Sequence, residues 1–337
     1  MKEAIVSKGP TVTIKDVPIP KAGQGQVVIK VVVSGSNPKD WKLPEWTGAE
    51  ANEGDDIAGT IHEVGPGASA YGFKVGDRVA AFHEMRTPHG SYAEYAVAHA
   101  YTTFFLPDET SFEEGAALPL AFLTAAVGLY AHDRLALPEP WAPATKTTPL
   151  VVYGGASAVG AYVIKYAQRS NIHPIITVAG RGKDFVEKLI DRSKGDTIVD
   201  YRSGDEAVVK GLKEALKGEK LYHAFDAVSE KGSYVNISKV LESDGKITLV
   251  LPGKEEIPKT IQKSQTMVGD VHSKLKDLGL VHSRYITKGL LEGWFPAHPH
   301  EVVPGGLEGI QQALTDLKEG KASAVKYVFR IGDTKGL

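Results

Sequence analysis

The sequence predicts a two-domain α/β protein in which a doubly wound parallel sheet accompanies a β-rich domain. Between residues 150 and 270, short apolar runs alternate with helical patterns, and this alternation is typical of a parallel sheet with helices on both faces. The first 120 residues instead contain short apolar runs separated by Gly- and Pro-rich turns, which favour a barrel-like all-β arrangement. A chain of 337 residues is also longer than one typical core, so two domains are expected.

Each expected element follows from the spacing of apolar residues. The parallel sheet has room for about five or six strands. Its strand-like runs are residues 151–153, 175–178, 197–201, 223–228 and 246–251. In the β-rich part the expected strands are residues 26–33, 56–64, 78–82 and 92–97, a helical stretch covers 112–130, and a helix around 307–317 precedes a last strand at 324–331.

Composition and charge exclude several classes of protein. Hydrophobic residues make up 42% and charged residues 24% of the chain, as in ordinary globular proteins. The formal net charge of −2 gives no reason to expect binding to nucleic acid or to an anionic membrane. No apolar run is long enough for a transmembrane helix, and the start of the chain lacks the apolar stretch of a secretory signal, so a cytoplasmic location is expected. The absence of cysteine excludes disulfides, thiolate nucleophiles and Cys-ligated zinc.

Residues 150–160, LVVYGGASAVG, predict a nucleotide-binding turn. A β-branched run meets a run of very small residues, and a helical pattern follows. Small residues at such a turn let backbone N–H groups approach a pyrophosphate at the positive end of the helix. The pattern departs from G-x-G-x-x-G because a serine replaces the middle glycine, and an ordinary strand–helix turn is the alternative interpretation. The expected cofactor contacts are Gly155, Ala156, Ser157, Ala158, Val159 and Gly160.

The end of the next expected strand indicates which nicotinamide cofactor binds. In an NAD site this position carries an acidic residue for the ribose 2′-hydroxyl. Here Gly180, Arg181 and Lys183 follow the strand, and no acid occurs until Asp184. Guanidinium and ammonium groups attract a 2′-phosphate, which a carboxylate would repel. The sequence therefore predicts NADP, and the alternative is that both cations belong to an ordinary solvated loop.

A series of short motifs, spread over the whole chain in a fixed order, resembles the medium-chain dehydrogenase/reductase superfamily on its zinc-independent, quinone-oxidoreductase-like branch. Two of these motifs resemble, more specifically, a fungal branch that includes the trans-acting enoyl reductases of polyketide pathways. They are the segment 37–42 (NPKDWK) and the nucleotide turn. The remaining motifs are residues 55–59, 64–65, 76–79, 90–95, 116–119, 124–125, 305–309 and 320–321.

The resemblance implies a division into domains. A GroES-like catalytic domain would comprise residues 1–122 and 286–337, so that the C-terminal segment completes it. A Rossmann NADP-binding domain would comprise residues 123–285. This division agrees with the change along the sequence from short apolar runs separated by Gly- and Pro-rich turns to alternating strand-like and helical patterns.

The chain departs from this superfamily at two places that matter for mechanism. Zinc alcohol dehydrogenases have Gly-His-Glu where this chain has Gly54-Asp55-Asp56, and they supply cysteine ligands. Without those ligands a catalytic zinc is not expected, and simple alcohol oxidation is disfavoured. His298 and His300 flank a proline and are expected to be solvated, since no third ligand lies nearby. Mitochondrial-type enoyl reductases have a catalytic tyrosine in the stretch that corresponds to 43–53, which contains none here.

Five side chains are expected to contribute individually. Lys42 is the motif-borne candidate for polarising or protonating the acceptor, and its alternative is a surface lysine. Asn37 resembles the residue that lines the nicotinamide pocket, and its alternative is a turn-capping asparagine. Thr124 resembles a cofactor-contacting threonine, and Asp40 is expected to hold a hydrogen-bond network. Tyr201 resembles the aromatic residue beside the adenosine, and a core tyrosine is its alternative.

Two classes of function follow. The first is an NADPH-dependent, zinc-independent reductase of activated double bonds (enones or enoyl thioesters) or of quinones. An activated acceptor suits this site, because hydrogen bonds to the carbonyl oxygen stabilise the enolate-like state that hydride transfer creates. A trans-acting enoyl reductase would also dock a carrier protein or a polyketide synthase. The second class is a non-catalytic sensor or accessory subunit that binds NADPH.

Overall fold

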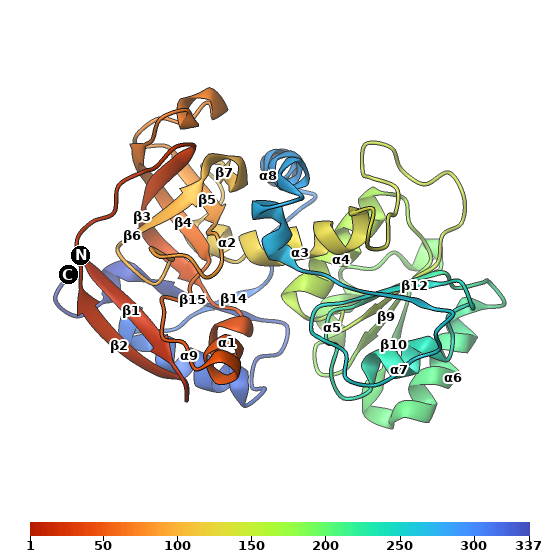
Figure 1. The fold of residues 1–337 in the computed structure, drawn as a ribbon. Coiled ribbons are helices and arrows are strands. Elements are labelled where there is room, and N and C mark those ends of the chain that lie inside the picture. Colours follow the sequence, from red (N-terminus) through yellow and green to blue (C-terminus); the bar gives the residue numbers. More distant parts are fainter. The chain divides into compact units, whose positions relative to one another are not determined.

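The computed structural model describes residues 1–337 and divides into two compact units. The first unit comprises Met1–Leu120 and Gly269–Leu337, and the second comprises Ala121–Val268. The first unit is rich in antiparallel strands and the second contains a parallel sheet, so the α/β fold class expected from the sequence is confirmed (Figure 1). Each unit is described by itself below.

The second unit is built on six parallel strands in the order β10-β9-β8-β11-β12-β13. The chain starts in the middle at β8, adds two strands on one side, and then returns to add three on the other. This order is that of a doubly wound dinucleotide-binding sheet, whose ligand binds where the direction of winding reverses. The strands are β8 (Leu150–Tyr153), β9 (Ile175–Ala179), β10 (Thr197–Asp200), β11 (His223–Asp226), β12 (Lys246–Leu249) and β13 (Gln262–Gln265).

Helices with one apolar face cover this sheet. In the helix α6, Val208, Leu212 and Leu216 recur at intervals of four residues and are buried against the strands, while its charged residues are exposed. Burying that stripe removes apolar surface from water, which is the main force that holds such a helix on its sheet. The helices of this unit are α3 (Pro119–Tyr130, which begins at the end of the first unit), α4 (Ala158–Arg169), α5 (Lys183–Glu187), α6 (Asp205–Leu216) and α7 (Ser233–Ser238).

The first unit contains a seven-stranded sheet and a separate hairpin. The sheet follows the order β14-β15-β3-β4-β5-β7, with β6 paired to β3 off this path. The hairpin strands are β1 (Lys2–Ser7) and β2 (Thr11–Asp16). The sheet strands are β3 (Gln26–Gly35), β4 (Asp56–Val64), β5 (Arg78–Phe82), β6 (Tyr95–His99), β7 (Thr103–Phe105), β14 (His300–Val302) and β15 (Lys326–Arg330).

Alternation along these strands builds the core of the first unit. Val27, Ile29 and Val31 of β3 point to one face and join a cluster with residues of β4, β5 and β6. Leu307 and Leu314, from the helical segment near the end of the chain, complete that cluster. The helices of this unit are α1 (Lys39–Thr47), α2 (Phe112–Ala116), α8 (Lys276–Leu291) and α9 (Ile310–Lys318).

The helical stretch expected at 112–130 is two helices. Ser111 caps α2 in a capping box with Glu114, in which each side chain bonds the other residue's backbone N–H. Pro119 opens α3, because proline has no N–H to donate and is well accommodated in the first turn of a helix. The chain therefore breaks between the two helices at residues 117–118.

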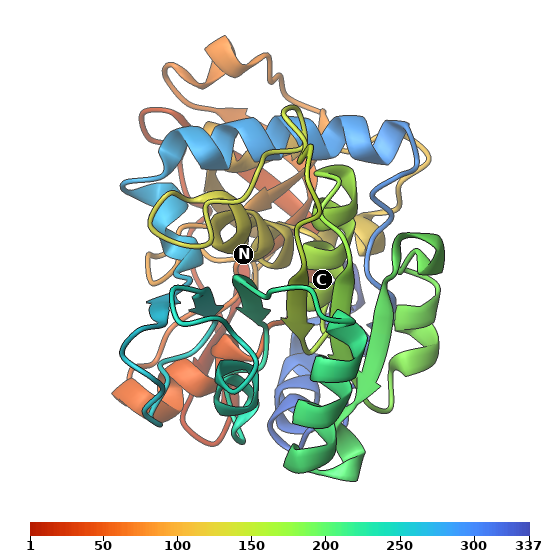
Figure 2. The ribbon, with the colours of Figure 1, turned by 90° about the vertical axis from the view of Figure 1, so that its right-hand side faces the viewer.

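The second border between the units lies earlier than the sequence-based division at residues 285 and 286. Helix α8, a single long helix in Figure 2, belongs to the first unit in full. Arg284 donates a hydrogen bond of 3.0 Å to the carbonyl of Thr103, and Thr287 Oγ1 donates one of 2.9 Å to the carbonyl of Phe105. These bonds attach α8 to the β7 region, a long-range contact that no local sequence pattern reveals.

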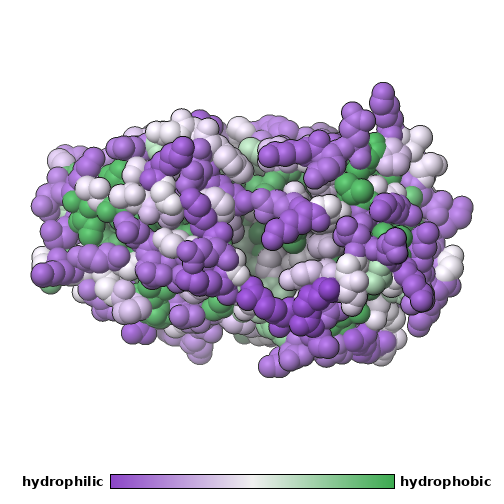
Figure 3. Space-filling view, turned by 90° about the horizontal axis from the view of Figure 1, so that it is seen from below, coloured by the Kyte–Doolittle hydropathy of each residue, from purple (hydrophilic) through white to green (hydrophobic).

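The surface carries few broad apolar areas on the face drawn in Figure 3, where hydrophilic side chains predominate and apolar patches are scattered among them. None of the helices has the length and apolarity that crossing a membrane requires.

Candidate active site

The turn between β8 and α4 has the structure of an anion-binding site. Gly154 adopts a φ of 84°, which lets the chain leave the strand sharply. Ser157 then caps α4: its Oγ accepts a 3.0 Å bond from the Gly160 N–H and donates a 2.8 Å bond to the Gly154 carbonyl. The N–H groups of Ala158 and Val159 donate to no acceptor within the chain. Two unused donors at the positive end of a helix fit a pyrophosphate.

The glycines of this turn are required by close packing. A Cβ on Gly155 would stand 2.0 Å from Thr177 Oγ1 in the neighbouring strand β9. A Cβ on Gly160 would stand 2.2 Å from the carbonyl oxygen of Gly154. Both positions exclude any side chain, so the turn keeps the shape in which its backbone lies open to a ligand.

The ends of β9 and β10 bring the other expected cofactor residues together. Gly180 follows β9, and a Cβ there would lie 2.5 Å from a ring carbon of Tyr201. Tyr201 is 44% exposed, so the structure does not support its alternative as a core residue. Arg181 and Lys183 are both exposed beside this pair. The segment thus offers an aromatic face and two cations at the C-terminal edge of the sheet.

An acid that was not predicted from the sequence lies at this same edge. Asp200 ends β10 opposite Ala179 of β9 in the register of the sheet. The Arg202 guanidinium bonds both oxygens of this carboxylate, at 2.9 and 3.1 Å from Nε and 2.5 Å from Nη2. Those bonds lower the pKa of Asp200 to about 2. Because Arg202 neutralises it, this carboxylate is compatible with a nearby 2′-phosphate.

Thr124 lies on α3, which is fixed to the sheet of the second unit by a close approach. Gly128, one turn further along the helix, leaves room for the ring of Phe225 of β11, since a Cβ there would lie 2.2 Å from that ring. Thr124 itself is buried, with 5% of its surface exposed. Its expected cofactor contact stays a prediction.

In the first unit, Asn37 connects the end of β3 to α1 and is buried. Its amide Nδ2 donates a 2.7 Å hydrogen bond to Asp56 Oδ2. Its carbonyl Oδ1 accepts a 2.9 Å bond from Lys326 Nζ. The side chain therefore caps no turn, which argues against the alternative interpretation. Asp56 and Lys326 were not predicted from the sequence as site residues.

Asp40 holds a hydrogen-bond network, as expected. Its Oδ2 accepts a 2.6 Å bond from the Tyr92 hydroxyl and a 2.7 Å bond from the Asn37 backbone N–H. Burial raises the pKa of Asp40, although Lys39 and these hydrogen bonds act in the opposite direction. Burial and the neighbouring carboxylates raise the pKa of the Tyr92 hydroxyl, so this phenol stays protonated and remains a donor.

Lys39 lies among three buried carboxylates. Its ammonium is 3.1 Å from Asp40 Oδ1 and 3.4 Å from Glu53 Oε2, and it forms a shorter ion pair with Asp55. Burial raises the pKa of both Glu53 and Asp55 to about 7, against the attraction of Lys39. The same carboxylates raise the pKa of Lys39 although its own burial opposes this. Asp55, which replaces the zinc-binding histidine, is thus part of a buried charge cluster.

Lys42 is not a surface lysine. Its exposed fraction is 8%, and its ammonium lies 4.8 Å from the ring centroid of Trp41 and 5.9 Å from that of Trp46. Aromatic faces stabilise an ammonium that has lost part of its hydration. The expected site residues are divided between the two units. Asn37 and Lys42 lie on one continuous segment of the first unit. The nucleotide turn, Thr124 and the residues at the ends of β9 and β10 lie in the second unit.

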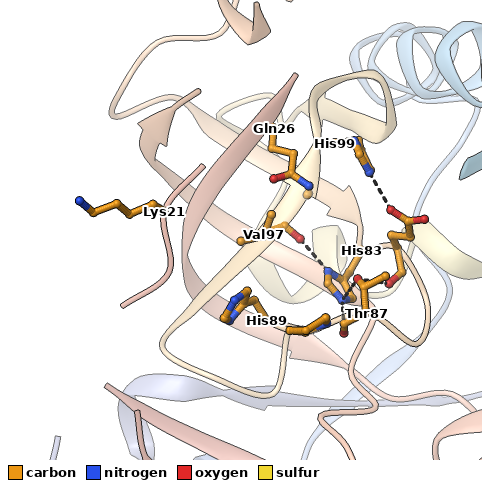
Figure 4. A pocket seen from close by; sticks show the side chains of 10 residues that line it. Lys21, Gln26, His83, Thr87, His89, Val97 and His99 are labelled. Atoms are coloured by element: carbon orange, nitrogen blue, oxygen red, sulfur yellow. Dashed lines mark hydrogen bonds and ion pairs between the residues drawn. The ribbon is translucent and has the colours of Figure 1, made fainter. Parts of the chain in front are cut away.

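A separate pocket in the first unit contains histidines but does not bring them together (Figure 4). Its volume is about 200 Å³. His83 bonds the Val97 carbonyl through Nδ1 at 2.7 Å, and His99 Nε2 lies 2.8 Å from Glu84. No group of three or more His, Cys, Asp or Glu side chains in the chain is arranged to hold a metal ion. Activity without a metal ion stays a prediction.

Comparisons with known proteins support this description. Residues 23–108 match the alcohol dehydrogenase GroES-like domain. The chain is 55% identical, over 92% of its own length and 92% of the relative's, to the trans-enoyl reductase fsr4 of Gibberella fujikuroi. It is also 29% identical to the trans-enoyl reductase phm4 of a Pyrenochaetopsis species, over 96% and 94% of the two chains.

Solved structures share the fold over nearly the whole chain. An alcohol dehydrogenase superfamily protein from Novosphingobium aromaticivorans has a TM-score of 0.79 at 21% identity, and 98% and 99% of the two chains are covered. The CurK enoyl reductase has a TM-score of 0.77 at 20% identity, with 97% and 98% covered. A mycobacterial protein solved with NADPH has a TM-score of 0.78 at 20% identity, with 97% and 99% covered.

The two units, the capped glycine turn and the order of strands thus define an oxidoreductase of the medium-chain dehydrogenase/reductase type. Within that class the chain belongs to the family of the fungal trans-enoyl reductases. The resemblance stated from the sequence motifs is confirmed.

Proposed function

We propose that this protein is an NADPH-dependent reductase of the carbon–carbon double bond in α,β-unsaturated carbonyl compounds, with enoyl thioesters as the preferred acceptors. The observation that carries the proposal is the turn between β8 and α4, in which Ser157 caps the helix and the amides of Ala158 and Val159 are left to bind an anion. Support for the acceptor comes from the relative at 55% identity, which is named a trans-enoyl reductase.

The residues of the second unit fit NADPH in particular. The pyrophosphate would bind the amides of the turn, and the adenine would lie against the exposed ring of Tyr201. The 2′-phosphate would bind Arg181 and Lys183, since Arg202 already neutralises Asp200. One of the solved structures with the same fold contains NADPH, in agreement with this assignment.

The residues of the first unit supply the polar groups that such a reduction needs. Bound NADPH provides the hydride for the electron-poor β-carbon of the acceptor. Negative charge then develops on the carbonyl oxygen, and a cation or N–H donor near that oxygen lowers the barrier. Lys42 is the proposed cation, and the Asn37 amide is the proposed positioning group for the reacting molecules. Proton delivery to the α-carbon completes the reduction.

Consumption of NADPH against three panels of acceptors tests the proposal. The panels are enoyl thioesters, simple enones and quinones, and each thioester is offered both as a small soluble form and attached to a carrier protein. We expect the fastest turnover with enoyl thioesters. A higher kcat/KM for the carrier-bound form would identify a carrier protein as the partner.

Two outcomes would overturn the proposal. Preferred turnover of quinones would make the protein a quinone reductase instead. Tight NADPH binding without turnover of any acceptor would favour the alternative function as a sensor or accessory subunit. Gly160→Ala is the matched negative control and should lose NADPH-dependent turnover. Its new Cβ would collide with the Gly154 carbonyl at the proposed anion site and would not touch Asn37 or Lys42 of the first unit.

A further inference from the structure

Three buried groups from distant parts of the first unit meet around the amide of Asn37. Asn37 and Lys326 are each 4% exposed, and Asp56 is fully buried. Asp56 Oδ2 accepts from Asn37 Nδ2 at 2.7 Å and from Lys326 Nζ at 2.5 Å, while Lys326 Nζ also donates to Asn37 Oδ1 at 2.9 Å. The three side chains thus form a closed triangle of hydrogen bonds.

This triangle permits only one orientation of the Asn37 amide. A carboxylate only accepts hydrogen bonds and an ammonium only donates them. Turning the amide over would place its oxygen against the Asp56 carboxylate and its NH₂ group against the Lys326 ammonium. Both hydrogen bonds would become repulsive contacts. The amide is consequently held with one N–H and one carbonyl lone pair not used by the triangle.

The two charged partners are themselves fixed. The other oxygen of Asp56, Oδ1, accepts a 2.6 Å bond from the Leu120 N–H. Lys326 lies on β15, which pairs with β3, and its Cε lies 3.0 Å from the place where a Cβ on Gly35 would stand. Glycine at position 35 therefore lets the lysine stem pass. A rigid support of this kind holds a functional side chain more accurately than a single hydrogen bond does.

An ion pair this deeply buried is a poor device for stability alone. Removing two charges from water is expensive, and well-packed apolar residues of similar volume often serve a fold as well or better. The pair here has a specific geometric effect, because each of its members bonds one end of the same amide. This combination indicates a role in orienting Asn37.

We propose that Lys326 and Asp56 are positioning residues, which hold the Asn37 carboxamide in the single orientation needed to bind a carbonyl or carboxamide group of the reacting molecules. The inference rests on the proposed function, because it assigns a role to residues of that active site. Neither residue is proposed to touch the acceptor or the cofactor.

A double-mutant cycle on kcat tests the inference. Lys326→Met removes the donor to Oδ1 and keeps the apolar stem, whereas Asn37→Ala removes the amide. We expect each single variant to lower kcat by about tenfold to a hundredfold, since small misplacements of positioning groups have effects of this size. In the Asn37→Ala background, Lys326→Met should change kcat by less than about threefold, because the group it orients is already gone. If the loss of kcat in the double variant equals the product of the losses in the two single variants, the inference is overturned.

Arg284→Met is the matched control for loss of a cation in the same unit. Arg284 donates only to main-chain carbonyls, of which Thr103 is the nearest at 3.0 Å. Its substitution should lower thermal stability. Any change in kcat caused by Arg284→Met should be equally large in the wild-type and in the Asn37→Ala background. Coupling of Arg284 to Asn37 as strong as that of Lys326 would also contradict the inference.

An exchange variant covers the case in which Lys326→Met does not fold. Asn37→Asp combined with Asp56→Asn keeps the number of charges, the ion pair with Lys326 and an acceptor for the Leu120 N–H. We expect this protein to fold with a lower melting temperature, because the NH₂ group introduced by Asp56→Asn would face the Lys326 ammonium, and to lose about tenfold or more in kcat below that temperature, because the amide has left position 37. Wild-type kcat in the exchange variant would overturn the inference.

A crystal structure of Lys326→Met provides a test that needs no turnover. We expect the Asn37 side chain to lose its single conformation, and retention of one unchanged conformer would contradict the inference. The outcomes are distinguishable from failure of the proposed function. If Asn37→Ala keeps full kcat, the assignment of Asn37 to the active site fails. If Asn37→Ala lowers kcat but Lys326→Met acts independently, only the positioning role fails.

Discussion

The ring of Tyr201 lies directly against the backbone of Gly180, at a distance that would leave a Cβ on this glycine 2.5 Å from a ring carbon. The contact joins the end of β9 to the short 3-10 helix Tyr201–Ser203 that follows β10. It keeps a 44% exposed aromatic face beside Arg181 and Lys183 at the edge of the sheet. An exposed ring fixed in this way offers a nucleotide base a flat surface at little entropic cost.

Arg181→Ala should weaken NADPH binding far more than NADH binding. The wild-type protein should bind NADPH more than about tenfold more tightly, because a charge-assisted bond to a phosphate contributes about 1.5 to 3 kcal/mol. Dissociation constants from fluorescence titration of both cofactors measure the effect. Lys210→Ala is the control, since this lysine is exposed on α6 and pairs with Glu214 of the same helix. Equal affinities for NADPH and NADH in the wild type would contradict the prediction.

Gly160→Ala should reduce NADPH affinity by about tenfold or more, because the new Cβ would lie 2.2 Å from the Gly154 carbonyl and would force the anion-binding turn apart. Gly332→Ala is a matched control, as no atom lies within 4 Å of the place where its Cβ would stand. Calorimetric titration with NADPH checks both variants. An unchanged dissociation constant in Gly160→Ala would show that the turn does not bind the cofactor.

Lys42→Ala should lower kcat by about tenfold to a thousandfold while the NADPH dissociation constant stays close to wild type, since a contact with developing charge strengthens in the transition state. Lys318→Ala is the control. This second lysine also lies near Trp41, with its ammonium 5.7 Å from the ring centroid, but it is bonded to Glu45 on the protein surface. Steady-state kinetics with the best acceptor decide the question, and an unchanged kcat would remove Lys42 from the site.

Stability should fall as the pH rises from about 4 to about 7 through the action of Glu53 and Asp55. Burial raises the pKa of both carboxyls to about 7 in the folded protein, whereas in the unfolded chain they titrate near their ordinary values. Between those values the folded state binds more protons than the unfolded state. Their stabilising contribution is therefore complete below the unfolded pKa and is lost as the pH passes the folded pKa.

The variant Glu53→Gln with Asp55→Asn isolates this effect. Relative to it, the wild type should lose about 1 to 3 kcal/mol of unfolding free energy between about pH 5 and about pH 8. His223 and His272, whose pKa burial lowers to about 4, give a slope of the opposite sign below about pH 6.5 that both proteins share. Urea unfolding across the pH range measures the difference, and parallel curves for the two proteins would refute the prediction.

Exhaustive chelation should leave activity unchanged, and elemental analysis should find no stoichiometric zinc. The expectation rests on the absence of cysteine and on Asp55 and Asp56 standing where zinc enzymes have His and Glu. Re-addition of zinc after chelation serves as the control. Zinc bound at one ion per chain and required for turnover would contradict it.

Local patterns were sufficient to predict five of the six strands in the second unit and the turn with Ser157 in place of a glycine, because these depend on the spacing of apolar and small residues within short segments. Strand β13 (Gln262–Gln265) was not predicted, because its residues are all polar. The capping role of Ser157 was not predicted, although a serine directly before a helical pattern is a typical N-cap. Family resemblance supplied the expectation that a C-terminal segment completes the first unit.

Long-range pairs could not be predicted in this way. Lys326 and Asp56 are 270 residues apart, and no local pattern marks a lysine on a strand as the partner of one particular carboxylate. The packing of α8 on the first unit, through Arg284 and Thr103, is a contact of the same kind. Asp200 and Arg202 were missed for a different reason: the acid sits on the strand after the one where NAD-binding acids are sought.

The position of β15 within the sheet also bears on how the protein is made. Strand β15 lies between β14 and β3, yet its residues leave the ribosome only after the whole second unit has been synthesised. Until then the C-terminal half of β3 has an unpaired edge, and the Asp56 carboxylate has no ammonium to neutralise it. The second unit can complete its folding on the nascent chain while the first unit waits, open and in need of protection from aggregation, for its last strand.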